Sequence, residues 1–374
     1  MKNNPFCPTE IRFSTLGELQ NTLQDLSSSS VCFIMSKSAA KRWKITDFIE
    51  QFKGKNSTLI WIDDIPPNPT QKDLVNALKQ IRNHELEVIV AIGGGSAIDL
   101  AKGISAFYRC EAPCTANEIS SRIKNRNYLD CDFVDIIAFP TTAGTGSEVT
   151  QWATIWDENK EEKFSIDAPG LKPKKVVIIP ELTVSVPPYM TLSTGLDAMC
   201  QAVEAYWSKR TTPLVQELAF RAIELFIHNL RKSVEMPTNL AYREKLCRAS
   251  VLAGLAFSQT RTTACHSISY PLTMHYEVPH GLAVSMTLHE VAKRNRGSFA
   301  NDEELFSLFE EYGGIKDWIN FVSKDIVEMR LSYFGIKEGD IPPIVKRAFT
   351  SGRMDNNPVD LSVKDVQEIL EAVL

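Results

Sequence analysis

The stretch LEVIVAIGGGSAIDLAKGISAF, residues 86–107, decides the fold class of this protein. An apolar run ends in three glycines, Gly93 to Gly95, and a helical pattern follows at once. Glycine lets the backbone approach a ligand closely, and a helix N-terminus offers unpaired N–H groups and a positive dipole end to a phosphate. We therefore predict a pyrophosphate-binding loop. It is not the G-x-G-x-x-G fingerprint, and a plain tight turn is the alternative.

The same alternation of strand and helix continues on both sides of this stretch. Amphipathic segments such as QKDLVNALKQIRNHE, residues 71–85, separate short apolar runs between residues 30 and 180. The runs predicted as strands are SVCFIM (30–35), STLIWI (57–62), LEVIVAI (86–92), DFVDIIAFP (132–140) and KKVVIIP (174–180). This order predicts an α/β domain with a parallel sheet and flanking helices.

The second half of the chain has a different pattern. Strand-like runs nearly vanish after Pro187, and segments such as 214–234 and 241–257 have helical periodicity. A chain of 374 residues is also longer than a single hydrophobic core usually supports. We predict an α/β dinucleotide-binding domain at residues 1–185 and an all-helical metal-binding domain at residues 186–374.

Composition restricts the class of protein. With 44% hydrophobic and 23% charged residues and no apolar run of the ~20 residues that span a bilayer, a soluble enzyme is expected. No apolar signal stretch opens the chain, so we expect a cytoplasmic protein with eight reduced cysteines. The close pair Cys110 and Cys114 has no second pair at zinc-site spacing. The net charge of −5, without a basic cluster, argues against nucleic-acid partners, and no membrane partner is expected.

A second loop, TTAGTGSEVT at residues 141–150, follows a predicted strand. Its hydroxyl groups and glycines stand at the carboxyl end of a parallel strand, where ligands of α/β proteins collect. A serine- and threonine-rich turn that caps a helix after Glu148 is the alternative.

Histidines and one carboxylate in the second half suggest a metal site. Asp197 and Gln201 are four residues apart, so they share one face of a helix. Four of the six histidines fall between residues 266 and 289. Clustered imidazoles with a carboxylate are typical of a site for Zn²⁺ or Fe²⁺, while exposed or core histidines are the alternative.

Five segments together resemble the iron-containing (group III) alcohol dehydrogenase family over nearly the whole chain. They are GGGSAIDLAK (93–102), PTTAGTGSEVT (140–150), PELT (180–183), TGLDA (194–198) and HSISYPLTMHYEVPHG (266–281). The last segment, with DAMCQAVEAYW (197–207), is further similar to the phosphonoacetaldehyde reductases of that family. The resemblance implies a dehydroquinate synthase-like fold and a metal-dependent, NAD(P)-linked alcohol dehydrogenase or aldehyde reductase.

The resemblance also implies a ligand set for one divalent metal. Its members here are Asp197, Gln201, His266 and His280. The family usually has histidine at the position of Gln201, and an amide oxygen is a weaker, harder donor, so lower affinity for Fe²⁺ or Zn²⁺ is expected. Tyr270 is a second departure, because many members have a proton-relaying histidine there.

Cofactor contacts follow from the same resemblance. The residues implied are Gly94, Gly95, Ser96 and Asp99 in the first loop and helix, Thr141, Thr142, Thr145 and Ser147 in the second loop, and Lys163. Members that prefer NAD often have an aspartate where this chain has Ser36, followed by Lys37. Without that carboxylate, and with a nearby cation, a 2′-phosphate is better accommodated, so NADPH is predicted over NADH. A solvated surface lysine is the alternative.

The expected reaction transfers hydride between the nicotinamide and a small aldehyde or alcohol, for example phosphonoacetaldehyde, in a homodimeric enzyme. Tyr270, His275 or water would supply the proton, and Arg261 would bind a phosphonate head group. Two other hypotheses are a dehydroquinate-synthase-like carbon–oxygen lyase, whose basic residues are not evident here, and a relic that lost activity with the ligand histidine.

Overall fold

The computed structural model describes residues 7–26, 30–53, 59–110, 115–157 and 163–374, with only the backbone for 50–53. The chain divides into two compact units. The first comprises the chain up to Thr142 together with Ser147–Thr183, and the second comprises Ala143–Gly146 together with Val184–Leu374. Each unit is described by itself.

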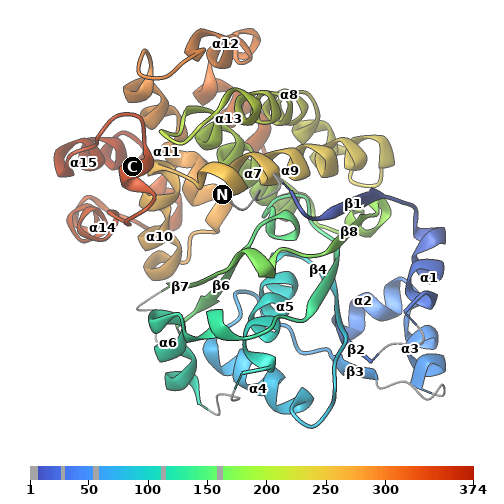
Figure 1. Cartoon of the computed structure of the whole chain (residues 1–374). Helices are drawn as coiled ribbons and strands as arrows, with labels where there is room; N and C mark the ends of the chain where they lie inside the picture. Colours follow the sequence, from blue (N-terminus) through green and yellow to red (C-terminus); the bar gives the residue numbers. More distant parts are fainter. Residues whose placement is uncertain (1–6, 27–29, 54–58, 111–114, 158–162) are drawn as a thin grey trace. The chain divides into compact units, whose positions relative to one another are not determined.

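A six-stranded parallel sheet organises the first unit (Figure 1). Its strands are β1 (Glu10–Phe13), β2 (Val31–Ile34), β3 (Leu59–Ile62), β4 (Val88–Gly93), β5 (Asp135–Pro140) and β8 (Lys175–Ile178), in the order β1-β8-β5-β4-β2-β3. All five predicted runs form strands of this sheet, which confirms the predicted fold class. They are apolar along their length because helices cover both faces of a parallel sheet.

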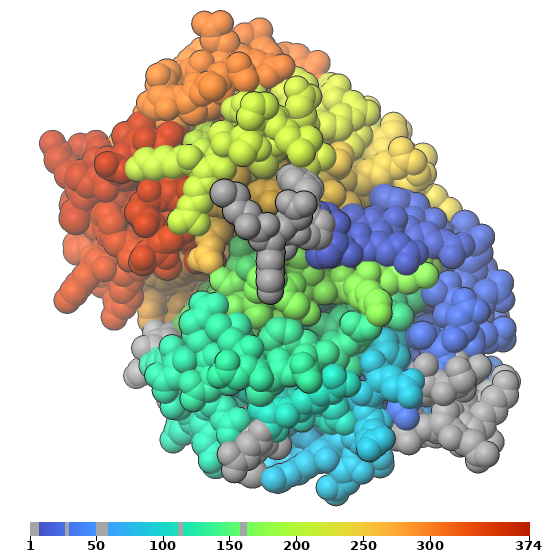
Figure 2. Space-filling view, viewed as in Figure 1, coloured from blue at the N-terminus to red at the C-terminus, as the bar shows by residue number. Residues whose placement is uncertain are grey.

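Strand β1 was not predicted from the sequence. Its four residues, EIRF, alternate charged and apolar side chains and are mostly exposed. In Figure 2 the blue atoms of the first part of the chain lie at the surface. It pairs with β8 at one edge of the sheet, so one long-range pairing rather than a buried apolar run stabilises it.

Six helices of the first unit are described. They are α1 (Leu16–Gln24), α2 (Lys37–Arg42), α3 (Thr46–Lys53), α4 (Gln71–Ile81), α5 (Gly95–Tyr108) and α6 (Ala116–Asn125). Buried residues of α1 to α3, such as Leu23 and Ile49, pack against one sheet face through Phe33 and Val90. Helix α5 packs on β4 and β5, and α4 packs on α5. The helix that follows the glycines is therefore fixed by the sheet core.

An antiparallel hairpin interrupts the α/β alternation and was also missed from the sequence. It consists of β6 (Trp152–Trp156) and β7 (Lys163–Asp167), which form a separate two-stranded sheet. The sequence WATIW alternates partly buried and buried side chains, as a half-covered ribbon requires. Strand β6 also packs against α5.

The prediction that all cysteines are reduced thiols is wrong for one pair. Cys110 and Cys131, 21 residues apart, form a disulfide. Tyr128, in the turn before Cys131, packs edge-on against Phe107 of α5, which brings the two cysteines together. Cys114 lies outside the described residues. The other described cysteines form no disulfide: Cys7, Cys32, Cys200, Cys247 and Cys265.

The second unit is helical, and its described residues contain no strand. Its helices are α7 (Pro188–Trp207), α8 (Pro213–Glu235), α9 (Leu240–Thr260), α10 (Ala264–Tyr276), α11 (His280–Asn295), α12 (Asp302–Ser307), α13 (Ile315–Ser323), α14 (Ile341–Arg347) and α15 (Val363–Ala372). Helices α7, α8 and α9 pack on one another, and α11 packs on α7 and α10. Among the described residues, no helix combines the length and the apolarity that crossing a bilayer requires.

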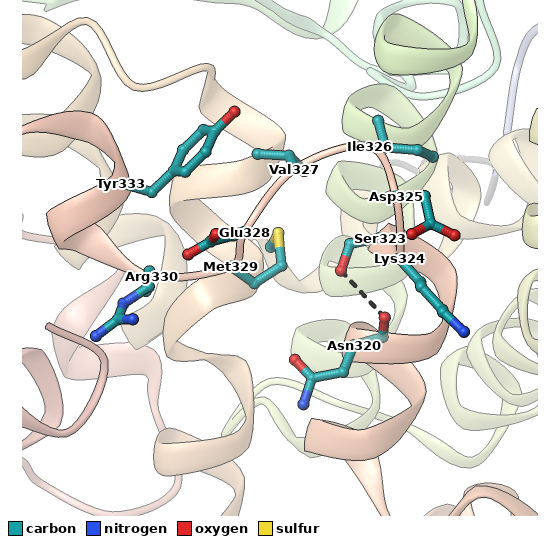
Figure 3. Close-up of a pocket in the computed structure, with 10 residues that line it drawn as sticks. All are labelled: Asn320, Ser323, Lys324, Asp325, Ile326, Val327, Glu328, Met329, Arg330 and Tyr333. Carbon is teal, nitrogen blue, oxygen red and sulfur yellow. Dashed lines mark hydrogen bonds between the residues drawn. The ribbon is translucent and has the colours of Figure 1, made fainter.

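A surface pocket of about 570 Å³ lies in the second unit, between the end of α13 and the short helical turn Leu331–Phe334 (Figure 3). Residues between Asn320 and Tyr333 line it. It contains none of the predicted site residues, so the candidate site is defined by the chemistry of its side chains rather than by this pocket.

Candidate active site

The glycine-rich loop joins β4 to α5 in the first unit. Gly93 ends the strand, Gly94 is the N-cap of α5 and Gly95 begins the helix. A glycine N-cap supplies no side chain to the first helical turn, so its N–H groups can face a phosphate. Ser96 contacts the preceding part of the chain, since its Oγ accepts a hydrogen bond from Asn68 N at 3.2 Å.

Asp99 and Ser147 bind each other. The Asp99 carboxylate accepts hydrogen bonds from Ser147 Oγ at 2.5 Å and from Thr154 N at 2.9 Å. Lys102 Nζ donates to Ser147 O at 2.6 Å and to Ser147 Oγ at 3.0 Å. These hydrogen bonds join Asp99 and Lys102 of α5 to Ser147 in the second loop.

Burial perturbs this cluster electrostatically. Lys102 is fully buried, and loss of solvation lowers its pKa to about 8 although Asp99 and Glu148 act in the opposite direction. Burial likewise raises the pKa of Glu148 to about 7, against the pull of Lys102. Burial therefore disfavours the charged forms of Lys102 and Glu148, and the charge of the cluster changes with pH near neutrality.

The residues predicted to select the cofactor lie at the start of α2. Ser36 is its N-cap, and its Oγ accepts a hydrogen bond from Ala39 N at 3.3 Å. The Lys37 side chain is 78% exposed, and its Nζ lies 2.8 Å from Asp63 Oδ2. That hydrogen bond and the charge of Asp63 raise the pKa of Lys37. The lysine is a solvated cation that already has a carboxylate partner.

The remaining predicted cofactor residues are partly exposed. Thr141 and Thr142 follow β5, and Thr141 N donates to Gly93 O at 3.0 Å, so the two loops of the first unit are joined there. Thr145 belongs to the short segment that groups with the second unit. Lys163 begins β7, with its Nζ 5.7 Å from the centre of the Trp156 ring.

Three helices of the second unit bring three predicted metal ligands together. Asp197 lies on α7, His266 on α10 and His280 at the start of α11, and their ligand atoms all lie within 4.8 Å of one another. Asp197 Oδ1 is 3.3 Å from His266 Nε2 and 4.0 Å from His280 Nε2. Asp197 and His266 are buried, while His280 is partly exposed.

Gln201 lies one turn after Asp197 on the same helix and is 5% exposed. Its Oε1 is buried and has no hydrogen-bond partner in the described parts of the chain. A buried amide oxygen without a partner is costly, and a cation would compensate for it. One carboxylate, two imidazoles and one amide oxygen fit a divalent transition metal.

Glu204 is a residue that the sequence reasoning missed. Fully buried on α7, it hydrogen-bonds His266 Nδ1 and accepts bonds from Cys265 N at 2.7 Å and Thr263 Oγ1 at 2.9 Å. Its position one turn after Gln201 in the helix was the available signal. By accepting from Nδ1, Glu204 leaves His266 Nε2 directed toward Asp197.

This pairing sets the charge of both groups when no cation is present. Burial opposes the ionised form of Glu204, but His266 and the hydrogen bonds outweigh burial and lower its pKa. Burial likewise opposes protonation of His266, but Glu204 and Asp197 outweigh it and raise its pKa to about 10. A cation and a proton therefore compete for the same imidazole nitrogen.

Tyr270 and His275, the two predicted proton donors, occupy different places. The Tyr270 ring stacks on His280 with centroids 6.0 Å apart and planes 8° apart. His275 comes nine residues after His266, two and a half helical turns, and is therefore on the opposite face of α10. It is exposed, and burial and Arg347 lower its pKa. We call Asp197, His266 and His280 the metal group. The structure does not bring His275 into it.

Arg261, the predicted head-group residue, ends α9 with a positive φ of 65°. Residues other than glycine seldom adopt this conformation, and strained backbone of this kind is common at functional sites. Its N–H donates to Phe257 O at 2.7 Å.

Two family models match the chain. The description "Iron-containing alcohol dehydrogenase" applies to residues 8–180, and "Fe-containing alcohol dehydrogenase family, C-terminal" applies to residues 191–374. The 1,3-propanediol dehydrogenase of Citrobacter freundii is 31% identical over 325 residues, which cover 83% of this chain and 82% of that protein.

Two further relatives carry names that bear on the substrate. A phosphonoacetaldehyde reductase of Streptomyces viridochromogenes is 36% identical over 244 residues, covering 63% of this chain and 60% of that protein. The crystal structure of sulfoacetaldehyde reductase from Bifidobacterium kashiwanohense in complex with NAD⁺ has a TM-score of 0.85 and 29% identity, and covers 100% of this chain and 99% of that one.

These matches confirm the resemblance and the enzyme class predicted from the five sequence segments. Family models match both halves, and relatives named as alcohol dehydrogenases match most of the chain. The chain belongs to the iron-containing alcohol dehydrogenase family and is an oxidoreductase of alcohols and aldehydes.

Proposed function

We propose that this enzyme interconverts a short aldehyde and its primary alcohol with NADP(H), using one divalent cation, Fe²⁺ or Zn²⁺. The cation is held by Asp197, His266 and His280, with Gln201 as a fourth, weaker ligand. One observation carries the proposal: the ligand atoms of the first three residues, from three different helices, lie within 4.8 Å of one another.

When bound, the nicotinamide supplies a hydride and the cation polarises the carbonyl oxygen as a Lewis acid. The side chains of the protein provide position and a proton. Glu204 keeps the His266 ring in one tautomer and one orientation. Tyr270, stacked on His280, offers its hydroxyl group as the proton donor for the forming alcohol.

The first unit is proposed to bind the dinucleotide. The pyrophosphate contacts the α5 N-terminus at Gly94, Gly95 and Ser96, supported by a glycine N-cap without a capping side chain. Thr141, Thr142, Thr145 and Lys163 remain proposed contacts. A preference for NADPH rests on Ser36 and Lys37, and it is expected to be small because Asp63 already pairs with Lys37.

The substrate is proposed to be phosphonoacetaldehyde, reduced to 2-hydroxyethylphosphonate. Two relatives are named for aldehydes with an anionic head group, which supports the choice. Arg261 belongs to the same unit as the metal group and would bind the phosphonate.

A homodimer is proposed as the working assembly. The outer edge of β1 has no partner strand in the described sheet and could pair with a second copy. Light scattering after size-exclusion chromatography would give the mass, and a monomer at micromolar concentration would reject this assembly.

The central test uses metal-free protein supplied separately with Fe²⁺, Zn²⁺ and Mn²⁺, followed by NADPH oxidation with propanal and phosphonoacetaldehyde. Asp197→Ala and His266→Ala should lose the metal and turnover but retain NADPH binding. His228→Ala, at a half-exposed position on α8, is the matched control.

Each hypothesis predicts a different result. Unchanged turnover in Asp197→Ala or His266→Ala would remove the metal assignment. A wild-type protein with little metal and no turnover of any aldehyde would be the inactive relic. A carbon–oxygen lyase would release product from a sugar phosphate without net oxidation of NADPH.

A further inference from the structure

A second guanidinium lies against the aromatic ring that stacks on a proposed metal ligand. Arg353 follows α14, and its Cζ is 5.5 Å from the centre of the Tyr270 ring. Tyr270 in turn stacks on His280. Arg353 and a proposed metal ligand therefore contact the same aromatic ring.

Arg353 has unused hydrogen-bonding capacity. Its Nε is buried and has no hydrogen-bond partner among the residues that the structure describes. A guanidinium presents five N–H donors in a planar fork, and burial of such a donor without an acceptor is unfavourable. An acceptor supplied by a ligand would remove this penalty.

Buried side chains fix the segment that carries Arg353. Ser267, the neighbour of His266, donates through Oγ to Ala348 O at 2.5 Å and accepts from Thr350 N at 2.9 Å. Gly352 takes a positive φ of 77°, which allows the chain to turn just before Arg353. The guanidinium is thus held on a segment attached directly to α10.

Asn356 anchors the other side of this segment. Its Nδ2 donates to Thr260 O at 2.9 Å and to Thr262 O at 3.1 Å, the residues on either side of Arg261. One hydrogen-bonding side chain therefore joins the Arg353 segment to the strained turn at Arg261.

Arg261 lies against the residue that precedes Arg353 in the chain. A Cβ atom placed on Gly352 would lie 3.5 Å from Arg261 Nη1, so the Arg261 guanidinium contacts the turn that precedes Arg353. Two cations that approach the same turn repel each other, and an anion bound by both relieves the repulsion.

Resting on the proposed aldehyde reduction, we propose that Arg353 binds the oxyanion head group of the substrate, together with Arg261. The substrate class is a short aldehyde, or the corresponding alcohol, with a phosphonate or sulfonate group at its far end. Such a head group accepts two parallel N–H···O bonds from one guanidinium. The Tyr270 ring, on which the Arg353 guanidinium lies, stabilises its positive charge by a cation–π interaction.

The test compares charged and neutral aldehydes in matched variants. Arg353→Met should lower kcat/KM for phosphonoacetaldehyde by about 100-fold, chiefly through KM, and change that for propanal by less than about threefold. Arg353→Lys keeps the charge without the fork and should lose about tenfold. Arg210→Met, at an exposed position on the loop before α8, should behave as wild type.

Sulfoacetaldehyde is the second anionic aldehyde, with a head group of the same shape as a phosphonate but less charge. A loss with either anionic aldehyde in Arg353→Met, with propanal spared, supports the head-group site, and the aldehyde with the higher wild-type kcat/KM has the natural head group. Equal losses with propanal and both anionic aldehydes would overturn the proposal, because Arg353 would then act only in packing.

A binding measurement separates this proposal from the proposed reaction. Calorimetry with 2-hydroxyethylphosphonate and with propan-1-ol needs no turnover. If Arg353→Met binds 2-hydroxyethylphosphonate more weakly than wild type does but binds propan-1-ol equally well, the head-group site is supported even if no aldehyde is reduced. Equal phosphonate binding by wild type and Arg353→Met, with thermal unfolding unchanged, would overturn it.

Discussion

At the scale of single residues, the proposed metal site depends on a side chain that contacts one of the metal-ligating residues and would not itself contact the metal or the substrate. Glu204 accepts from three donors at the start of α10, Thr263 Oγ1, Cys265 N and His266 N, while its other oxygen bonds the His266 ring. A carboxylate near a helix N-terminus is also favoured by the helix dipole. One buried acid therefore both anchors a helix and orients an imidazole.

Replacing this acid should weaken metal binding. In Glu204→Gln an amide replaces the carboxylate, and its NH₂ group can force the wrong His266 tautomer. We expect about 10- to 100-fold weaker affinity for Zn²⁺ or Co²⁺, measured by competition with a chelator. Glu303→Gln, at an exposed position on α12, is the control. Unchanged affinity in Glu204→Gln would limit the role of Glu204 to packing.

The proposed preference for NADPH also rests on single side chains. Lys37→Ala should lower kcat/KM with NADPH by only about fivefold, because an exposed cation contributes little. The value with NADH should stay nearly constant, because NADH has no 2′-phosphate. The effect should shrink at high salt. Lys41→Ala, exposed on the same helix, is the comparison. A similar loss with both cofactors would contradict a 2′-phosphate contact.

At the scale of elements, the metal group requires α7, α10 and α11 to approach closely. Asp197 and Gln201 come from one face of α7, while His280 is the first residue of α11. Gly281, directly after His280, lies against the α7 backbone, and a Cβ atom there would be 1.9 Å from Ser193 O. Only a residue without a side chain permits this contact.

Gly281→Ala should therefore separate α11 from α7. Overpacking of this kind costs about 1–3 kcal/mol, and displacement of His280 should lower metal retention as well. Chemical denaturation and metal content after dialysis measure the two effects. Gly339→Ala, where an added Cβ meets nothing within 4 Å, should change neither. Normal stability and metal content in Gly281→Ala would show that α11 can shift without consequence.

At the scale of the whole molecule, the buried cluster of Asp99, Lys102 and Glu148 makes stability depend on pH. The pKa of Glu148 is about 7 in the folded protein, above its ordinary value of 4.5. The folded state therefore binds more protons than the unfolded state between these pH values. Stability from this group is fully present below about pH 4.5 and is lost as the pH rises through about 7.

Glu148→Gln should remove this part of the pH dependence. We expect the variant to gain stability relative to wild type as the pH rises from about 4.5 to about 7, measured as the difference in Tm across that range. Glu87→Gln, exposed just before β4, is the control. Parallel Tm curves for wild type and Glu148→Gln would show that Glu148 does not titrate in this window.

Local sequence patterns were sufficient to predict much of the fold and most of the proposed metal ligands. Apolar runs predicted all but one strand of the parallel sheet, because a strand covered on both faces must be apolar throughout. The four-residue spacing of Asp197 and Gln201 and the cluster containing His266 and His280 were visible in the sequence, and the family resemblance named the ligand set.

The tertiary structure alone decided the contacts between distant segments. Glu204 reaches His266 across 62 positions, Arg353 reaches Tyr270 across the helices between them, and Cys110 meets Cys131 around α6. Strand β6 likewise packs against α5, about 50 positions earlier in the chain. Periodicity and spacing in the sequence reflect which residues share a face within one helix or one strand. The partners named above are far apart in the sequence, and they become neighbours only when tertiary packing closes the long loops between them.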